Sequence, residues 1–304
     1  MELSAIQQAL HTVSAIPVTP FTESGEADFA TYAALVERMV AGGITVVTPN
    51  GNTGEFYSLT PEEHRAAVQA AVAGAQGKAL VLAGVGFDAA TAAAMAREAA
   101  SLGAHAVMVH QPVHPYRSDE GWIAYHKAIA DAVPALGVVP YVRDAAIGAA
   151  ALGGLADACP NFVGVKYAVA NPQLFATLVR QVGPDRLAWI CGIAESWAPF
   201  FWPGGAHGFT SGLVNVITGP SLQMQQALEQ GDYARAMAIW AQVRPFEELR
   251  ARRNNANNVS AVKEAMAQMG LCSRTVRPPI SELPEAERQE VTQILATLGV
   301  AEKA

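Results

Sequence analysis

The sequence contains few cysteines. Only three of its 304 residues are cysteine, at Cys159, Cys191 and Cys272. An odd number of scattered cysteines does not form a disulfide framework, and this spacing matches no common metal site. We therefore expect a protein of the reducing cytoplasm.

The chain also lacks an excess of positive charge, since 20 Lys and Arg residues against 27 Asp and Glu residues leave a net charge of −7. This balance argues against a nucleic-acid partner. No apolar run approaches the roughly 20 residues of a membrane helix, so no membrane partner is expected. The segment Met1–Ile6 lacks the basic and apolar regions of a signal peptide. Any binding site for an anion must be local.

Apolar residues are abundant, at 51% of the chain, and they recur in short runs separated by segments of helical spacing. Eight such strand–helix repeats without a reversal favour an α/β fold of the TIM (β/α)8 barrel type over an open doubly wound sheet. The expected strands are Val13–Pro17, Ile44–Thr48, Leu80–Gly84, Ala106–Val109, Gly137–Tyr141, Phe162–Lys166, Leu187–Cys191 and Gly208–Ser211.

The expected helices between the strands follow the same order. They are Phe29–Val40, Pro61–Ala75, Ala89–Leu102, Asp119–Val133, Leu152–Ala158, Pro172–Val182 and Ala194–Phe201. After Gly219-Pro220 only helical patterns remain, at Ser221–Gln230, Tyr233–Arg252, Ser260–Gly270 and Glu285–Leu298. We predict a catalytic barrel domain over 1–220 and a C-terminal helical domain over 221–304.

Lys166 is the polar exception at the end of the expected strand Phe162–Lys166. One interpretation is a lysine whose aliphatic chain lies along the sheet while its ammonium reaches water. The alternative is a lysine held inside the barrel, where a low dielectric lowers its pKa and makes its amine a nucleophile for a carbonyl. The remainder of the chain must distinguish the two.

A glycine-rich turn, Gly51-Asn52-Thr53-Gly54, follows the second expected strand. Glycines let backbone N–H groups turn toward a small anion, and Thr53 adds a hydroxyl. An ordinary strand–helix turn would also use glycine. No Gly-Lys-Ser/Thr follows, so the turn is not a nucleotide-binding P-loop.

Tyr141 ends the fifth expected strand, and Arg143 follows two residues later. The carboxyl ends of barrel strands share one mouth, so Tyr141 and Lys166 are expected to meet there. A phenol beside an amine can move the protons of imine formation, and an arginine can bind a carboxylate with two hydrogen bonds. The simpler alternatives are a tyrosine that plugs the barrel and a surface pair between Arg143 and Asp144.

His110 and His114 are four residues apart, but Pro112 and Pro115 prevent a regular helix between them. No nearby cysteine or acid completes a metal-ligand set, so we expect one histidine to line the barrel mouth and no metal to bind. The basic cluster at residues 250–253 is expected to be a solvated face or a subunit contact, because the whole chain is acidic.

These features together resemble the dihydrodipicolinate synthase / N-acetylneuraminate lyase family, whose members form a Schiff base through a lysine. The resemblance covers nearly the whole chain. It is carried by the motifs Ile16-Pro17-Val18-Thr19-Pro20-Phe21, Gly51-Asn52-Thr53-Gly54-Glu55, Ser58-Leu59-Thr60-Pro61-Glu62-Glu63, Tyr141, Gly164-Val165-Lys166, Val259–Leu271 and Arg277-Pro278-Pro279.

The resemblance implies a TIM barrel with a C-terminal helical domain, assembled as a homotetramer (a dimer of dimers). It implies that Lys166 forms an imine with a small 2-keto acid and that Tyr141 moves protons. Thr53 and the adjacent backbone, with Asn52 and Gly54, would hold the carboxylate of the keto acid. No metal or organic cofactor is implied. Gly192, directly after the seventh strand, and Thr210, near the end of the eighth, complete the expected substrate-binding residues.

The family pattern usually has two small hydroxyl residues before Gly54, where this chain has Asn52-Thr53. The sequence departs from the synthase pattern at two further positions. Where synthases place a tyrosine that crosses a subunit contact, this chain has His114, and their carboxylate-binding arginine falls at Ala146. Arg143 stands instead two residues after Tyr141, which is similar to the 5-dehydro-4-deoxyglucarate dehydratase branch.

We therefore expect a Schiff-base lyase, either a dehydratase or an aldolase, acting on a 2-keto acid derived from a sugar acid. 5-Dehydro-4-deoxyglucarate is the favoured substrate, with His114 and Arg143 among the binding residues. The first alternative is a 4-hydroxy-tetrahydrodipicolinate synthase that condenses pyruvate with aspartate semialdehyde. The alternative of another class is a non-catalytic keto-acid sensor, against which the presence of both Lys166 and Tyr141 argues.

Overall fold

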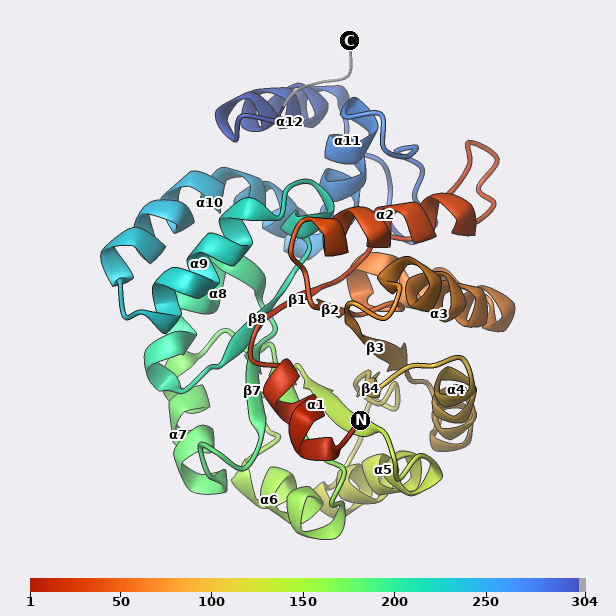
Figure 1. Cartoon of the computed structure of the whole chain (residues 1–304), viewed down its shortest axis with the longest axis vertical. Coiled ribbons are helices and arrows are strands. Elements are labelled where there is room, and N and C mark those ends of the chain that lie inside the picture. The colour runs from red at the N-terminus through yellow and green to blue at the C-terminus, as the bar shows by residue number, and fades with distance from the viewer. Residues whose placement is uncertain (301–304) are drawn as a thin grey trace.

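Eight short parallel strands form a closed barrel in chain order, with β8 pairing back onto β1 (Figure 1). The computed structural model describes residues 1–300. The TIM barrel prediction is confirmed, and every expected strand is present with ends shifted by two residues or fewer. The strands are β1 (Val13–Ala15), β2 (Val46–Val47), β3 (Leu80–Val85), β4 (Ala106–Val109), β5 (Gly137–Val142), β6 (Gly164–Tyr167), β7 (Ala188–Cys191) and β8 (Gly208–Ser211).

Helices cover the outside of the barrel between successive strands. They are α2 (Phe29–Ala41), α3 (Pro61–Ala75), α4 (Ala89–Ser101), α5 (Asp119–Ala132), α6 (Ala149–Ala158), α7 (Pro172–Val182), α8 (Ala194–Phe201) and α9 (Gly219–Glu229). The start of α3 illustrates how local sequence sets these bounds. The Thr60 hydroxyl accepts a hydrogen bond from the Glu63 N–H, the Glu63 carboxylate accepts one from the Thr60 N–H, and Pro61 occupies the first turn.

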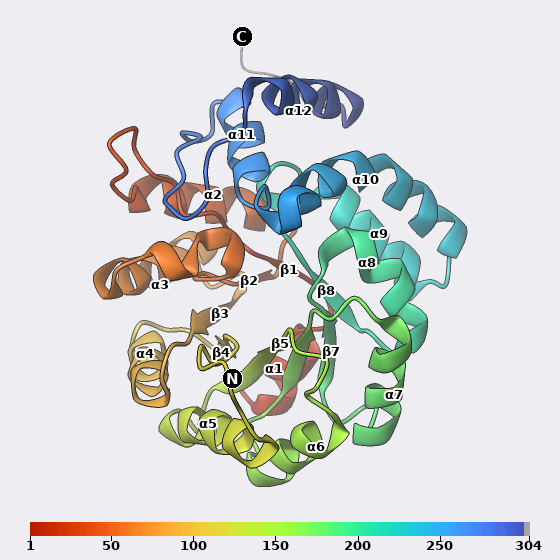
Figure 2. The same cartoon turned by 180° about the vertical axis from the view of Figure 1, so that it is seen from behind.

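Among the α-helices of the described residues, one was not predicted. The seven residues of α1 (Leu3–Ala9) lie across one end of the barrel, which faces the viewer in Figure 1 and lies behind in Figure 2. Ile6 and Leu10 are buried there with inward side chains of the strands such as Leu82, Met108 and Val139. So short a segment, with no side-chain cap, has little helical signal of its own, and packing against the barrel stabilises it.

Three further helices follow the barrel and pack beside α2 and α9 at the top of Figure 1. They are α10 (Tyr233–Asn255), α11 (Ser260–Gln268) and α12 (Glu285–Thr297). Asp232 caps α10 by accepting a hydrogen bond from the N–H of Arg235. The division of the chain at residue 220 stays a prediction: α9 spans it, and residues 301–304 of the expected C-terminal domain lie outside the described part. Within residues 1–300, no helix combines the length and apolar character that crossing a membrane requires.

Candidate active site

Lys166 and Tyr141 stand side by side at the ends of adjacent strands. The β5–β6 register places the two residues directly opposite one another. Lys166 is only 5% exposed, and its Nζ lies 4.1 Å from the centre of the Tyr141 ring and 3.6 Å from Met108 Sδ. The interpretation of Lys166 as a lysine that extends into water is therefore wrong, because its amine stays inside the barrel.

The surroundings of Lys166 disfavour its charged form. Burial, and then the positive charge of Arg143, lower the pKa of Lys166 to about 7. A large fraction of its amine is therefore unprotonated near neutral pH and able to attack a carbonyl. Burial raises the pKa of Tyr141, so its phenol keeps its proton over the same range.

The turn after β2 brings Asn52 and Thr53 to the same place. The Asn52 side-chain amide lies 3.5 Å from the Tyr141 hydroxyl, and Thr53 is 5% exposed. Behind them, the Gly54 carbonyl accepts a 2.8 Å hydrogen bond from the Thr19 hydroxyl. A Cβ on Gly54 would lie 3.0 Å from the Pro17 carbonyl oxygen, so glycine allows the turn to pack closely against the segment after β1.

A cavity of about 250 Å³ opens above Lys166. Gly192 and Thr210 form part of its wall, and a Cβ on Gly192 would lie 3.0 Å from Cγ of Lys166. Glycine at this position therefore leaves room for the lysine side chain. The predicted site residues that line the cavity are Asn52, Thr53, Tyr141, Arg143, Lys166, Gly192 and Thr210.

Arg143 is exposed at the rim of the cavity, with its guanidinium 6.0 Å from the centre of the Tyr141 ring. Asp144 does not pair with it, as the simpler alternative required, because the Asp144 carboxylate binds Arg117 at 2.7 Å. Within residues 1–300 no carboxylate forms an ion pair with Arg143, so its charge is available to a ligand.

His110 and His114 lie in different surroundings. His110 is buried; it stacks on Phe56 at 3.9 Å and contacts the Asn50 carbonyl at 2.8 Å, so it supports the turn after β2. Burial lowers its pKa to about 3, which keeps it neutral. His114 is exposed, contacts the Tyr116 carbonyl and does not line the cavity of its own chain. Its place in a substrate site therefore stays a prediction.

Residues of α10 and the turn that follows it also line the cavity, which the sequence did not predict. Arg250 is 6% exposed and donates 2.7 Å and 2.6 Å hydrogen bonds to Glu247 and Asn258. The expectation that residues 250–253 form one solvated face or subunit contact is wrong for Arg250, because Glu247 compensates its charge inside the fold. Asn255 joins these residues in the cavity wall. Only the tertiary contact between α10 and the barrel mouth identifies them.

The chain matches known proteins over almost its whole length. The model of the "Dihydrodipicolinate synthetase family" matches residues 9–298. A probable 5-dehydro-4-deoxyglucarate dehydratase of Polaromonas naphthalenivorans is 32% identical over 287 residues, covering 93% of this chain and 94% of the relative. A probable dehydratase of the same name from Rhodococcus opacus is 34% identical over 283 residues, or 92% of each chain. The crystal structure of dihydrodipicolinate synthase from Oceanobacillus iheyensis is 39% identical, with a TM-score of 0.94 over 98% of this chain and 99% of the other.

Proposed function

The chain belongs to the dihydrodipicolinate synthetase family, and from this premise we propose that it is a dehydratase whose substrate is a 2-keto acid with a second carboxylate, such as 5-dehydro-4-deoxyglucarate. The observation that carries the proposal is the uncompensated guanidinium of Arg143 at the rim of the Lys166 cavity. In a protein of net charge −7, this local positive charge gives a dianion a favourable place to bind.

The chemistry begins at the unprotonated amine of Lys166. Its nitrogen attacks the ketone, and loss of water gives an imine that withdraws electrons. The adjacent CH₂ then loses a proton to form an enamine. The enamine expels the hydroxyl of the next carbon, which takes up a proton and leaves as water. Hydrolysis of the imine consumes one water and restores Lys166, so the net change is loss of one water from the substrate.

Two groups beside Lys166 support this sequence. The Tyr141 phenol, directly across the β5–β6 pair, carries protons during imine formation, a role that contributes about 10²–10⁴-fold in rate. Thr53 and the adjacent backbone N–H groups hold the carboxylate next to the ketone. Arg143 binds the far carboxylate, and the cavity between these two ends accommodates the hydroxyl-bearing carbons.

A second candidate is 4-hydroxy-tetrahydrodipicolinate synthase, which condenses pyruvate with aspartate semialdehyde. The Oceanobacillus iheyensis protein, with its 39% identity, supports it. Against it stands Ala146, which occupies the position where the synthase pattern has an arginine. Its backbone N–H donates a hydrogen bond to the Asp144 carboxylate. We therefore favour the dehydratase.

The test compares two activities of the variant Arg143→Met. A charge-assisted hydrogen bond contributes roughly 1.5–3 kcal/mol, so kcat/KM for 5-dehydro-4-deoxyglucarate should fall about 10- to 100-fold. Pyruvate has no far carboxylate, so its borohydride trapping on Lys166 at saturating pyruvate and at pH 9 should change little. The high pH matters because loss of the Arg143 charge should raise the pKa of Lys166.

The matched control is Arg65→Met, which removes an exposed arginine paired with Glu98 on the outer surface. It should leave both activities at wild-type levels. Equal losses of dicarboxylate turnover and pyruvate trapping in Arg143→Met would mean that Arg143 supports the site generally. Wild-type condensation of pyruvate with aspartate semialdehyde, without turnover of the dicarboxylate, would establish the synthase instead.

A further inference from the structure

The turn that follows β2, residues 50–59, has an unusual backbone. Asn50 and Glu55 adopt left-handed conformations, with φ of 59° and 60°. Such values are uncommon outside glycine and persist where surrounding contacts enforce them. Thr53, the proposed ligand of the keto-acid carboxylate, lies between these two residues. The position of its hydroxyl therefore depends on what holds the turn.

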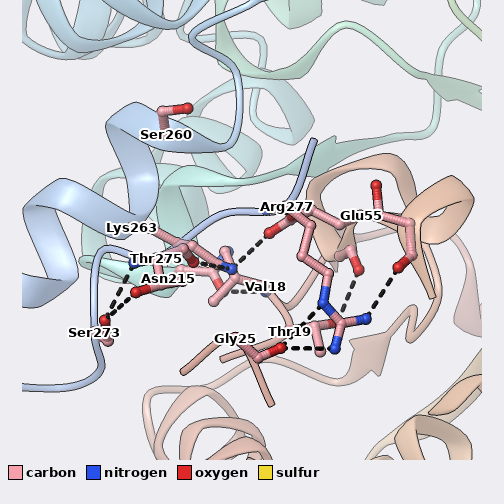
Figure 3. Close-up of polar contacts among 12 residues, drawn as sticks. Val18, Thr19, Gly25, Glu55, Asn215, Ser260, Lys263, Ser273, Thr275 and Arg277 are labelled. Carbon is pink, nitrogen blue, oxygen red and sulfur yellow. Dashed lines mark hydrogen bonds and ion pairs between the residues drawn. The ribbon is translucent and has the colours of Figure 1, made fainter. Parts of the chain in front are cut away.

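One contact that holds the turn comes from the C-terminal helices. Lys263 on α11 reaches 208 residues back along the chain, and its Nζ lies 2.5 Å from Glu55 Oε1 (Figure 3). The side chains are 0% and 1% exposed. Lys263 also donates to the Thr275 carbonyl at 2.8 Å and lies 4.0 Å from the centre of the Phe21 ring. Its ammonium is thus enclosed by partners from the barrel loops and from the segment that follows α11.

The segment after α11 holds the same turn a second time. The Arg277 N–H donates to the other carboxylate oxygen, Glu55 Oε2, at 2.9 Å. Its guanidinium donates to the Ser58 carbonyl at 3.0 Å and binds both carboxylate oxygens of Glu63 at 2.7 Å. Both oxygens of Glu55 are therefore occupied, and the far end of the turn is fixed to the start of α3.

A buried ion pair is a weak source of net stability, because desolvation of two charges offsets much of their attraction. An apolar pair of similar volume would stabilise the fold as well. The ion pair differs from an apolar contact in being directional: it is favourable only when both side chains hold one geometry. That property suits a turn whose backbone is left-handed at Glu55, two residues from Thr53.

We propose that Lys263 is a positioning residue, which acts through Glu55 to hold the turn that binds the carboxylate of the keto acid. The C-terminal helices therefore set the affinity of the barrel for its substrate. The substrate part of this inference rests on the proposed function, in which Thr53 and its neighbours bind that carboxylate. Its consequence is that loss of the ion pair weakens keto-acid binding while the reactivity of Lys166 is retained.

The test is the double variant Lys263→Met/Glu55→Gln, which leaves no unpaired buried charge and keeps an acceptor for the Arg277 N–H. The measurement is borohydride trapping of pyruvate on Lys166 over a range of pyruvate concentrations. We expect the half-saturating concentration to rise about 10- to 100-fold, because a small misplacement of the binding groups has an effect of this size. The rate at saturation should stay within about threefold of wild type, because the variant leaves the amine of Lys166 untouched.

The matched control is Glu264→Gln. Glu264 is the next residue on α11, is 2% exposed and pairs with Arg274 at 3.0 Å, but it does not touch the turn. Its loss should lower the melting temperature without raising the half-saturating pyruvate concentration. An unchanged half-saturating concentration in a folded double variant would overturn the proposal, as would an equal rise in Glu264→Gln. If the double variant does not fold, the isosteric Glu55→Gln is measured against the same two outcomes.

A second measurement separates this inference from the proposed function. Amide hydrogen exchange over residues 51–56 reports the order of the turn without any substrate. Faster exchange there in the double variant, and not in Glu264→Gln, supports the positioning role, whereas unchanged exchange contradicts it. If wild-type protein traps no pyruvate, the proposed chemistry fails and the exchange measurement alone decides whether Lys263 orders the turn.

Discussion

At the scale of single residues, the proposed chemistry depends on Lys166, and the pKa of its amine governs when that chemistry is possible. Burial lowers this pKa to about 7, so the amine is unprotonated above that pH and protonated below it. We expect the initial rate of imine formation with pyruvate to rise about tenfold per pH unit up to pH 7 and then to level off. The measurement is a short incubation at each pH, followed by a borohydride quench and mass analysis.

The comparison variant for this profile is Lys166→Met, which fills the barrel interior and should show no labelling at any pH. A rate that keeps rising to pH 10 would show an ordinary lysine pKa and contradict the effect of burial. Labelling at Lys78 or Lys263 in the wild type would contradict the assignment of the nucleophile.

Tyr141 is the second residue whose role can be tested alone. The variant Tyr141→Phe keeps the ring that packs over Lys166 and removes only the proton-carrying hydroxyl. We expect kcat to fall about 10²–10⁴-fold with little change in stability. Tyr125→Phe serves as the control, because its hydroxyl donates to the Phe87 carbonyl and does not line the cavity. Turnover of Tyr141→Phe within about threefold of wild type would make Tyr141 a packing residue only.

At the scale of elements, the two ends of the barrel have separate tasks. The strands deliver polar groups to the mouth, while α1 closes the opposite end with Ile6 and Leu10. Ile6 is only 1% exposed at the closed end. Changes in α1 should therefore affect stability and leave the chemistry of Lys166 intact.

The variant Ile6→Ala tests this separation. Loss of a buried isoleucine leaves a cavity and should lower the free energy of unfolding by about 2–5 kcal/mol, measured by urea denaturation. The folded protein should still trap pyruvate at the wild-type rate. Gln8→Ala, at an exposed position of the same helix, should change stability by less than about 0.5 kcal/mol. A large loss of trapping in folded Ile6→Ala would show that the closed end does influence the site.

At the scale of the whole molecule, the prediction concerns the association of subunits. The family resemblance predicts a homotetramer, and the surface around His114 fits a subunit contact. Val113 and Tyr116 beside it are 57% and 82% exposed, and Tyr57 across the rim is 53% exposed. Exposed apolar side chains gathered near a site are typical of interaction surfaces.

Co-expression of two impaired variants tests whether His114 acts across such a contact. We expect light scattering to show four chains of 31.9 kDa in the wild type. His114→Ala and Lys166→Ala should each be impaired alone. Co-expressed, they should regain activity, because some sites then combine an intact Lys166 with an intact His114 of another subunit. Lack of recovery in mixed tetramers, or full activity of His114→Ala, would confine the site to one chain.

The sequence by itself determined the barrel, and it predicted which residues gather at its mouth. Alternating strand and helix patterns predicted the order of elements, because each pattern follows from local burial. The strand-end positions of Tyr141 and Lys166 predicted their proximity, because parallel strands share one carboxyl end. The family resemblance, rather than the glycine pattern alone, predicted that Asn52 and Thr53 lie beside the substrate, and both residues line the cavity.

Only the tertiary structure decided which charges are buried and with what they pair. Arg250 belongs to a basic run in the sequence, yet it lies inside the fold, because Glu247 and Asn258 compensate it there. Lys263 and Glu55 are 208 residues apart, and no local pattern links them. The pKa of a lysine depends on desolvation and on the distance to other charges, and so does the choice of partner for a buried carboxylate. Both quantities are set by the folded chain and cannot be read from the order of residues.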